Sequence, residues 1–242
     1  MKISVIGGTG LIGSQVVKNL NAAGHEAVPH SKSTGIDIIS GQGLDEAVAG
    51  ADVVVNLTNS PTFDEASLAF FQTSMDNLLA AAHKSGVGHY VILSIVGVEQ
   101  VPELDYYRAK VLQEKLLAAG PIPYSIVRAT QFMEFMDAAM SWTSDADTVR
   151  LPATPIQPIA SKDVAAAVAE VAGGAPLNGI RNIAGPEVFT LDELGRTTLS
   201  RKGDNRTVVT DPTAGMFAVV KGDVLTDKDA HLAPTHYTDW LS

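Results

Sequence analysis

The sequence contains no cysteine, which excludes disulfides, cysteine-based zinc sites and a cysteine nucleophile. It also has no apolar run of the roughly 18 residues that a membrane-spanning helix requires, and its N-terminus lacks the long apolar stretch of a secretory signal. Basic residues are few, because 17 Lys and Arg stand against 27 Asp and Glu, giving a formal net charge of −10. This balance argues against nucleic-acid and membrane partners, which favour a basic face, and we expect a cytoplasmic protein.

The 242 residues are 45% hydrophobic and 18% charged, a composition typical of a globular protein. Short apolar runs alternate with helical patterns along the first half of the chain. The patterns predict strands over residues 3–6, 26–29, 36–39, 51–57, 89–94 and 124–127, and helices over residues 11–23, 44–48, 65–84 and 105–119. This alternation predicts an α/β fold, a doubly wound parallel sheet with helices on both faces.

A glycine-rich loop lies between the first predicted strand and the first predicted helix. Gly7, Gly10 and Gly13 form a G-x-x-G-x-x-G pattern. In this context the first glycine allows a tight turn, the second allows close approach of the backbone to a pyrophosphate, and the third allows close helix–strand packing. The phosphates then face the N-terminus of the helix. The alternative is a flexible loop that happens to be rich in glycine, but the strand before it and the helix after it favour dinucleotide binding.

The segment after the second predicted strand favours NADP(H) over NAD(H). NAD-binding proteins place an acidic residue there to bind the ribose 2′-hydroxyl, whereas this chain has Ser31, Lys32 and Ser33 and no acid between residues 27 and 36. Two hydroxyls and one cation suit a 2′-phosphate, although Lys lacks the bidentate fork of Arg. The alternative is a solvated turn with an incidental lysine. Asp37 either accepts a hydrogen bond from the adenine amino group or only begins a strand.

Tyr106 and Lys110 lie four residues apart at the start of a predicted helix and therefore share one face. An ammonium group beside a phenol lowers the pKa of the phenol, which makes the phenol a usable proton donor and acceptor. Alone, such a pair is more often a solvated helix face. Its position after the strand predicted over residues 89–94 of a dinucleotide-binding fold favours a catalytic pair.

Several segments together resemble the atypical short-chain dehydrogenase/reductases, close to the NmrA-like NAD(P)-binding group. The matching segments are GGTGLIGS (7–14), VILSIVGV (91–98), YYRAKVLQE (106–114), IPYSIVRATQF (122–132) and PIASKDVAAAV (158–168). The resemblance implies a Rossmann-type fold in which Tyr106 donates a proton and Lys110 holds the nicotinamide ribose. The residues that we expect to bind the cofactor are Gly7, Thr9, Gly10, Leu11, Ile12, Gly13, Ser31, Lys32, Ser33, Asp37, Asn56, Leu57, Thr58 and Lys110.

Two further expectations concern the catalytic set and the substrate. The family often has two consecutive serines after the strand at residues 89–94, whereas this chain has Ser94 followed by Ile95, so Ser94 is a third catalytic candidate with an altered context. In the family the loop after residues 124–127 borders the nicotinamide. Here it carries Phe132, Met133 and Phe135, which either line an apolar substrate pocket or pack at a helix edge.

The chain is thus predicted to be a single NAD(P)-binding domain over residues 1–242, with a cofactor-binding core to about residue 130 and a small substrate-side region from about residue 131. Within that region the patterns predict a loop over residues 142–158, a helix over residues 162–171 and a strand over residues 179–184. No metal site is expected, because the six histidines are scattered and no carboxylate completes a ligand set. We expect a monomer or homodimer.

The expected function is an NADPH-dependent oxidoreductase that reduces a carbonyl, quinone or conjugated small-molecule acceptor, with Tyr106 as proton donor. Two alternatives remain open from the sequence. One is an NADP-binding redox sensor that acts through a protein partner. The other is a nucleotide-sugar epimerase or dehydratase, which shares the fold but usually carries a longer substrate region than the residues after Thr130 provide.

Overall fold

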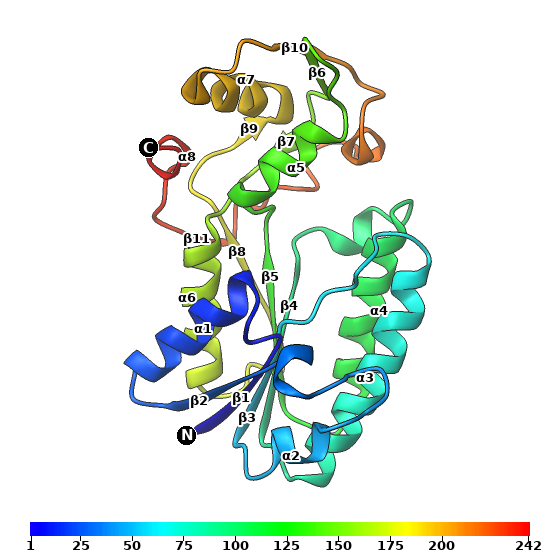
Figure 1. Ribbon diagram of the computed structural model, residues 1–242, viewed down its shortest axis with the longest axis vertical. Coiled ribbons are helices and arrows are strands. Elements are labelled where there is room, and N and C mark those ends of the chain that lie inside the picture. The colour runs from blue at the N-terminus through cyan, green and yellow to red at the C-terminus, as the bar shows by residue number, and fades with distance from the viewer. The chain divides into compact units, whose positions relative to one another are not determined.

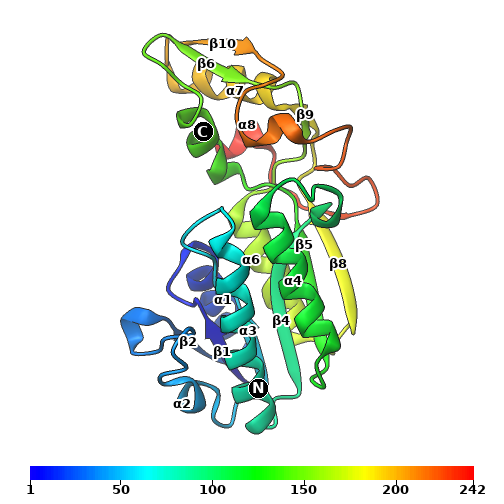
Figure 2. The same ribbon diagram turned by 90° about the vertical axis from the view of Figure 1, so that its right-hand side faces the viewer.

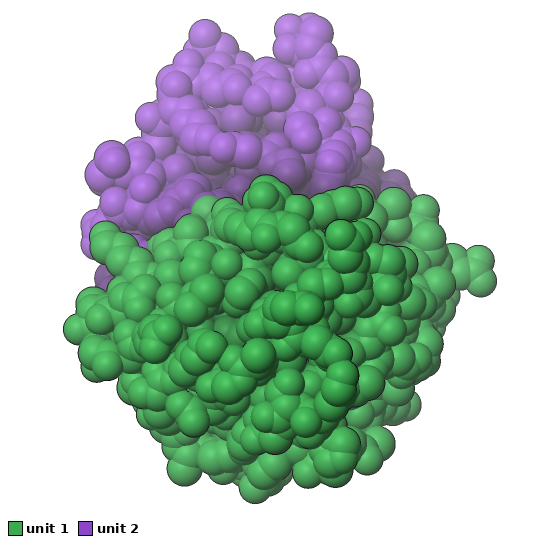
Figure 3. Space-filling view, turned by 60° about the horizontal axis from the view of Figure 1, so that its bottom comes forward, with its two compact units in different colours: residues 1–128, 164–181 green, residues 129–163, 182–242 purple.

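The computed structural model describes all 242 residues, and the chain forms two compact units, coloured separately in Figure 3. The first unit contains residues 1–128 and 164–181, and the second contains residues 129–163 and 182–242. The first unit is therefore built from two separate stretches of chain. Residues 164–181, which the sequence placed among the substrate-side elements, lie in the unit that carries the glycine loop.

The first unit contains most of a parallel sheet with helices on both faces, as the sequence predicted. The sheet order is β11-β8-β5-β4-β3-β1-β2, and β1 pairs in parallel with both β2 and β3. Helices α1 and α6 cover one face, and α3 and α4 cover the other (Figures 1 and 2). The elements are β1 (Lys2–Ile6), α1 (Leu11–Ala22), β2 (Glu26–His30), α2 (Leu44–Val48), β3 (Val53–Asn56), α3 (Ala66–Lys84), β4 (His89–Ile95), α4 (Asp105–Ala119), β5 (Tyr124–Ala129), α6 (Ser161–Gly173) and β8 (Gly179–Ala184). Strand β11 (His231–Leu232) pairs with β8 at residues 183 and 184, which belong to the second unit.

Continuous apolar sequence explains why the central strands lie inside. Val53, Val54 and Val55 of β3 are all buried, as expected for a strand that is covered on both faces. On one face of the sheet, Met75 and Leu78 of α3 belong to the same buried cluster as the strand residues around them. Each such side chain contributes roughly 1.5–3 kcal/mol when it leaves water.

Two predictions of local structure are wrong. Residues 36–39 do not form a strand, because the Asp37 carboxylate accepts hydrogen bonds from the backbone N–H groups of Ile39 (2.9 Å) and Ser40 (3.4 Å) and closes a turn. Asp commonly stabilises turns in this way. Residues 142–158 are not wholly a loop, because they include β6 (Thr148–Leu151) and β7 (Pro155–Ile156).

The second unit is built from short strand pairs and helices. Strand β6 pairs in parallel with β10 (Thr207–Thr210), and β7 pairs in antiparallel fashion with β9 (Phe189–Thr190). Helices α5 (Met136–Ser141), α7 (Leu191–Lys202) and α8 (Tyr237–Trp240) complete it. Tyr237 is fully buried, and its hydroxyl lies 2.6 Å from that of Thr198 on α7, which anchors the C-terminal segment inside this unit.

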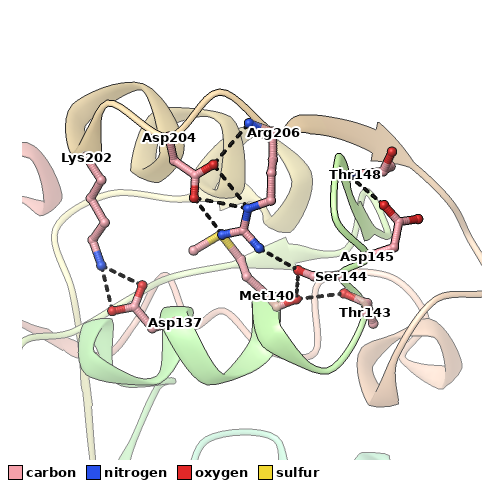
Figure 4. Close-up of polar contacts among 9 residues, drawn as sticks. All are labelled: Asp137, Met140, Thr143, Ser144, Asp145, Thr148, Lys202, Asp204 and Arg206. Carbon is pink, nitrogen blue, oxygen red and sulfur yellow. Dashed lines mark hydrogen bonds and ion pairs between the residues drawn. The ribbon is translucent and has the colours of Figure 1, made fainter.

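Polar contacts join the α5–β6 segment to the α7–β10 segment within the second unit (Figure 4). The Lys202 ammonium lies 2.6 Å from the Asp137 carboxylate, and Arg206 forms an ion pair with Asp204 at 2.6 Å. Arg206 also donates to the Ser144 hydroxyl at 3.2 Å. Such ion pairs at the surface add little to stability, because water and salt screen them. None of the helices is sufficiently long and apolar to cross a membrane.

Candidate active site

The glycine loop follows β1, and two of its glycines are required by geometry. Gly7 has a φ of +80°, and a Cβ added to it would lie 3.0 Å from the Leu57 carbonyl group. A Cβ added to Gly13 would lie 2.1 Å from the Gly7 carbonyl oxygen. A positive φ favours glycine, and no side chain fits at 2.1 Å from a backbone atom. The loop therefore needs these residues for the turn and for helix–strand packing, as the sequence predicted.

Helix α1 presents an uncapped N-terminus beside this loop. Gly10 precedes the helix without a side-chain cap, and the first turn contains no acidic residue. The first backbone N–H groups of a helix have no intrahelical acceptor, and the helix dipole favours an anion there. Thr9, Gly10 and Leu11 are exposed, whereas Ile12 is buried. These residues fit the pyrophosphate of a dinucleotide, because they offer N–H donors without a competing carboxylate.

The end of β2 is hydrogen bonded to the glycine loop. The backbone N–H groups of Gly7 and Gly8 donate to the His30 carbonyl oxygen at 2.8 and 3.1 Å. The residues after His30 are therefore held next to the loop. Dinucleotide-binding folds place the adenosine ribose at this position.

Two hydroxyls and one exposed ammonium group occupy this position. The hydroxyls of Ser31 and Ser33 lie 2.7 Å apart, and the Lys32 side chain is 89% exposed, 3.9 Å from Asp37. The pKa of Asp37 is lowered mainly by the hydrogen bonds from the Ile39 backbone N–H, then by those from Ser40. Because these bonds engage the carboxylate in a turn, the adenine contact expected of Asp37 stays a prediction.

The segment after β3 approaches the loop through its backbone. The Leu57–Thr58 backbone is the group that a Cβ on Gly7 would contact. Asn56 itself is buried, where its amide donates to the Tyr90 hydroxyl at 3.2 Å and its oxygen accepts from the Thr58 hydroxyl at 2.7 Å. The structure thus places Leu57 and Thr58 beside the loop and gives the Asn56 side chain an internal, structural role.

Tyr106 lies in the first turn of α4 with its hydroxyl engaged. The hydroxyl donates to the Asn59 side-chain oxygen at 2.6 Å. Its ring makes an edge contact with Phe63, at a centroid distance of 5.0 Å, and a tilted contact with Phe71 at 6.2 Å. Burial raises the pKa of Tyr106, and the Asn59 hydrogen bond opposes this shift only in part. The phenol therefore stays protonated at neutral pH.

Lys110 is buried one turn further along α4, and its ammonium group is fully engaged. It donates to the Leu93 carbonyl oxygen at 2.7 Å and to the side-chain oxygen of Gln113. It also lies 4.9 Å from the centre of the Phe71 ring. Burial lowers the pKa of Lys110 to about 7, against a smaller opposing effect of the Glu114 carboxylate.

The predicted coupling between these two residues differs from what the structure shows. We expected Lys110 to lower the pKa of Tyr106, but the pKa of Tyr106 is raised, and the hydrogen bonds of Lys110 go elsewhere. The Phe71 ring contacts both side chains. Sharing a helix face is therefore insufficient for coupling, because each polar group is held by a different partner.

Ser94, the third catalytic candidate, lies near the end of β4. Its side chain is 4% exposed, and its hydroxyl has no hydrogen-bond partner within the protein. The preceding residue, Leu93, provides the carbonyl oxygen that binds Lys110. The hydroxyl is therefore available to a ligand, and its catalytic role stays a prediction.

The three expected substrate-binding residues lie in the second unit. Met133 is buried in the core, and its backbone N–H donates to the Ile159 carbonyl oxygen at 2.9 Å. Phe132 and Phe135 are half-buried. The Phe135 ring packs against Trp142 at a centroid distance of 5.2 Å. The structure thus gives Met133 a packing position, whereas the substrate role of the two phenylalanines stays a prediction.

Sequence reasoning missed three residues around Tyr106, namely Asn59, Phe63 and Phe71. They lie 35–47 positions earlier in the chain, so no local pattern connects them with Tyr106. For Asn59 a signal existed, because it closely follows β3. Ligands bind at the carboxyl ends of parallel strands, beside the point where the strand order reverses.

Comparisons with known proteins agree with this geometry. A family model described as NAD(P)H-binding matches residues 7–173. The chain belongs to this NAD(P)H-binding family. It is 30% identical over 210 residues to the (4-alkanoyl-5-oxo-2,5-dihydrofuran-3-yl)methyl phosphate reductase of Streptomyces griseus, which covers 79% of this chain and 70% of the relative. The prediction of an NAD(P)-dependent oxidoreductase is thereby confirmed at the level of enzyme class.

A second relative and a solved structure extend the comparison of this NAD(P)H-binding protein. The Photosystem II assembly factor Ycf39 of Synechocystis is 28% identical over 55% of this chain and 46% of its own length. The chain thus spans less than half of that relative. The NADPH-dependent quinone oxidoreductase QOR2 of Escherichia coli, complexed with NADPH, has a TM-score of 0.68 and 20% identity over 87% of this chain and 78% of that one. This likeness supports the Rossmann-type fold.

Proposed function

We propose that this protein is an NADPH-dependent reductase of a carbonyl, quinone or conjugated small-molecule acceptor, with Tyr106 as the proton donor. The observation that carries the proposal is the Tyr106 hydroxyl, which is oriented at the start of α4 by its 2.6 Å hydrogen bond to Asn59. An acid of this kind complements hydride chemistry, because reduction of a polarised double bond requires one hydride and one proton.

The preference for NADPH is supported by the group of side chains after β2. Lys32 is exposed, and Ser31 and Ser33 stand beside it. In the nearby Asp37 carboxylate, one oxygen accepts from backbone N–H groups and the other lies 3.9 Å from the Lys32 ammonium group. A 2′-phosphate would gain charge-assisted hydrogen bonds here from Lys32 and from the two serine hydroxyls.

Conjugated acceptors are favoured by the Streptomyces relative. Its name describes a 5-oxo-2,5-dihydrofuran ring, in which the ring double bond is conjugated to the carbonyl group. Reduction of such a double bond would place the hydride on the carbon that is β to the carbonyl group. We propose the same class of bond for this chain, a C=C or C=O bond that a carbonyl group polarises.

In this proposal the bound nicotinamide supplies the hydride. Tyr106 donates its proton to the carbon or oxygen atom that gains electron density, so that two hydrogen atoms are added across the double bond. Asn59 orients the phenol before the transfer. Lys110 acts through the Leu93 carbonyl oxygen and holds the end of β4, which carries the unpaired Ser94 hydroxyl. In the related family the corresponding lysine holds the nicotinamide ribose, and that role stays a prediction here.

The direct test is a screen of acceptors with NADPH and with NADH at equal concentrations. The readout is the decrease in absorbance of the reduced nicotinamide. The panel includes menadione as a quinone, an unsaturated lactone and an aromatic aldehyde. We expect oxidation of NADPH in preference to NADH with at least one of them. Tight NADPH binding without oxidation by any acceptor would contradict the proposed activity.

A second candidate function is a nucleotide-binding regulator that acts through a protein partner. It is favoured by the relative that is named as an assembly factor. In that case the protein would bind NADPH, show no turnover and retain a partner protein in a cofactor-dependent manner. The acceptor screen therefore separates the two candidates.

A further inference from the structure

Arg128, on β5, binds two carboxylates of the first unit at once. Its Nε and Nη2 atoms donate to the two oxygens of Glu114 on α4, at 2.9 and 2.6 Å. Its Nη1 atom lies 2.9 Å from a carboxylate oxygen of Glu99, in the short helix Val98–Gln100 between β4 and α4. The Arg128 and Glu114 side chains are 12% and 9% exposed, so solvent screens their attraction little. No role described above uses Arg128.

Glu114 and Lys110 have the spacing of an ion pair, but the structure gives them different partners. They lie four residues apart on α4, and both are buried. Opposite charges at this spacing on a helix usually attract each other. Here both carboxylate oxygens of Glu114 bind Arg128. The Lys110 ammonium group instead binds the Leu93 carbonyl oxygen, at 2.7 Å, and the side-chain oxygen of Gln113.

Arg128 is well suited to compete for this carboxylate. A planar guanidinium group matches the two oxygens of a carboxylate, whereas an ammonium group offers a point charge. Loss of Arg128 would leave the buried Glu114 carboxylate without its partner, which is strongly unfavourable in a protein interior. The cation four residues away on the same helix face is Lys110. The carboxylate would therefore take Lys110 as its new partner.

Such an exchange of partners would change the end of β4 that belongs to the proposed active site. Lys110 holds this end through the Leu93 carbonyl oxygen, directly before Ser94. An ammonium group that turns toward Glu114 would give up this hydrogen bond. It would also hold its proton more firmly, because a neighbouring carboxylate favours the charged form of an amine.

Among the charged groups around Lys110, Glu114 is the one that acts on its protonation. Burial lowers the pKa of Lys110 to about 7, and the charge of Glu114 opposes this shift. From α3, the group in contact with the ammonium is the uncharged Phe71 ring. Ionisable side chains on the elements packed against Lys110 have partners of their own: Asp76 of α3 binds Gln72, Tyr90 of β4 binds Asn56, Tyr106 of α4 binds Asn59, and Glu99 binds Arg128.

We propose that Arg128 is a positioning residue of the proposed active site, which withholds the Glu114 carboxylate from Lys110 and so keeps the ammonium group on the Leu93 carbonyl oxygen. The inference rests on the proposed function for the importance of Lys110. The exchange of partners itself is a property of the ligand-free protein. It can therefore be measured without cofactor, acceptor or turnover.

The measurement is a pH titration of Lys110 by NMR, in protein labelled with ¹³C at the lysine ε-carbons. The Lys110 signal is assigned by its absence from the spectrum of Lys110→Met. In Arg128→Met the midpoint of this titration should rise above that of the wild type by about one pH unit or more, because the released carboxylate pairs with the ammonium group. An unchanged or lower midpoint in Arg128→Met would overturn the inference.

A double variant separates this role from simple loosening of the structure. Arg128→Met/Glu114→Leu removes both charges of the pair, a replacement that protein interiors often tolerate. Its midpoint should lie at or below that of the wild type, because no carboxylate is released. If the loss of Arg128 only admitted water to Lys110, the midpoint would rise in the single and the double variant alike. That result would also overturn the inference.

The two carboxylates bound by Arg128 provide matched controls. Glu114→Gln should lower the midpoint, because its charge acts on Lys110, whereas Glu99→Gln should leave it unchanged. Equal shifts in these two variants would contradict a specific role of Glu114. If Arg128→Met does not fold, Arg128→Lys replaces it in the same comparison. A smaller rise is expected there, because an ammonium group does not bind both carboxylate oxygens as a guanidinium group does.

In an active enzyme the same variants give a second readout. The pH dependence of kcat that follows Lys110 should shift to higher pH in Arg128→Met and should return in the double variant. An unshifted profile in Arg128→Met would contradict the inference. A protein that oxidises no NADPH would contradict the proposed activity, whereas the NMR titration would still decide the role of Arg128.

Discussion

The Tyr106 hydroxyl donates a 2.6 Å hydrogen bond to the Asn59 side-chain oxygen and thereby joins the first turn of α4 to the loop after β3. Tyr106→Phe removes this hydroxyl and preserves the ring contacts with Phe63 and Phe71. We expect NADPH binding to be unchanged and kcat to fall about 10²- to 10⁴-fold, the usual contribution of a general acid. Steady-state kinetics and cofactor titration measure the two effects. Tyr124→Phe on β5 is the matched control, and equal turnover in both variants would remove Tyr106 from the mechanism.

The exposed ammonium group of Lys32 should distinguish NADPH from NADH. Lys32→Ala should raise the Kd for NADPH about 10-fold, because a hydrogen bond to a charged group is worth about 1.5–3 kcal/mol when it is fully formed. The Kd for NADH should stay the same, and raising the salt concentration should reduce the difference. Lys18→Ala, at an exposed position of α1, controls for the loss of one positive charge. An equal increase in Kd for NADPH and NADH would show that Lys32 does not recognise the 2′-phosphate.

Two glycines of the cofactor loop should respond differently to alanine. A Cβ on Gly13 would lie 2.1 Å from the Gly7 carbonyl oxygen, whereas a Cβ on Gly10 would meet that oxygen at 3.4 Å, an ordinary contact. Gly13→Ala should therefore destabilise the fold by about 1–3 kcal/mol or more through overpacking. Gly10→Ala should fold normally and bind NADPH more weakly, because its Cβ occupies space that the pyrophosphate needs. Thermal unfolding and NADPH titration measure these effects, and normal affinity in Gly10→Ala would place the pyrophosphate elsewhere.

The buried ammonium group of Lys110 should make stability depend on pH above neutrality. Its pKa falls from 10.5 to about 7 in the folded protein because of burial. Between these values the unfolded chain binds more protons than the folded one, so stability rises with pH across this window. The destabilising effect is complete below about pH 7 and absent above the unfolded pKa.

Lys110→Met removes this dependence. The unfolding temperature of the variant relative to the wild type should therefore be highest near pH 7 and should decrease toward pH 10.5. For a chain of this length, 1 kcal/mol corresponds to about 2–4 °C in Tm. The measurement is thermal unfolding of both proteins in a pH series, with Lys18→Met as an exposed control. A constant difference across the series would contradict a lowered pKa of Lys110.

The outcome for individual elements shows where sequence patterns suffice. Helix α4 was predicted over residues 105–119 and strand β8 over residues 179–184, and both match the structure. Gly120 directly follows α4, where the chain leaves the helix. The strand expected at residues 36–39 failed, because the Asp37 side chain forms turn hydrogen bonds that compete with strand pairing. Apolar content alone could not reveal that competition.

The candidate site likewise has one part that the sequence predicts and another part that it does not. The glycine loop was found from the sequence, because its spacing lies within one short segment, although its contacts with His30 and Leu57 come from the tertiary structure. The surroundings of Tyr106 and Lys110 are not local. Asn59 and Phe71 reach them from the β3–α3 region, and Leu93 and Gln113 bind the ammonium group.

The sequence by itself thus determined the α/β fold, the parallel sheet, the nucleotide loop and the face shared by Tyr106 and Lys110. These features follow from periodicity and from backbone constraints that act over a few residues. Only the tertiary structure decided which partner holds each polar group, that Asn56 is internal, and that Arg128 binds Glu114. Burial and hydrogen bonding depend on residues distant in the chain, so protonation and ligand-binding capacity emerge only when the fold assembles them.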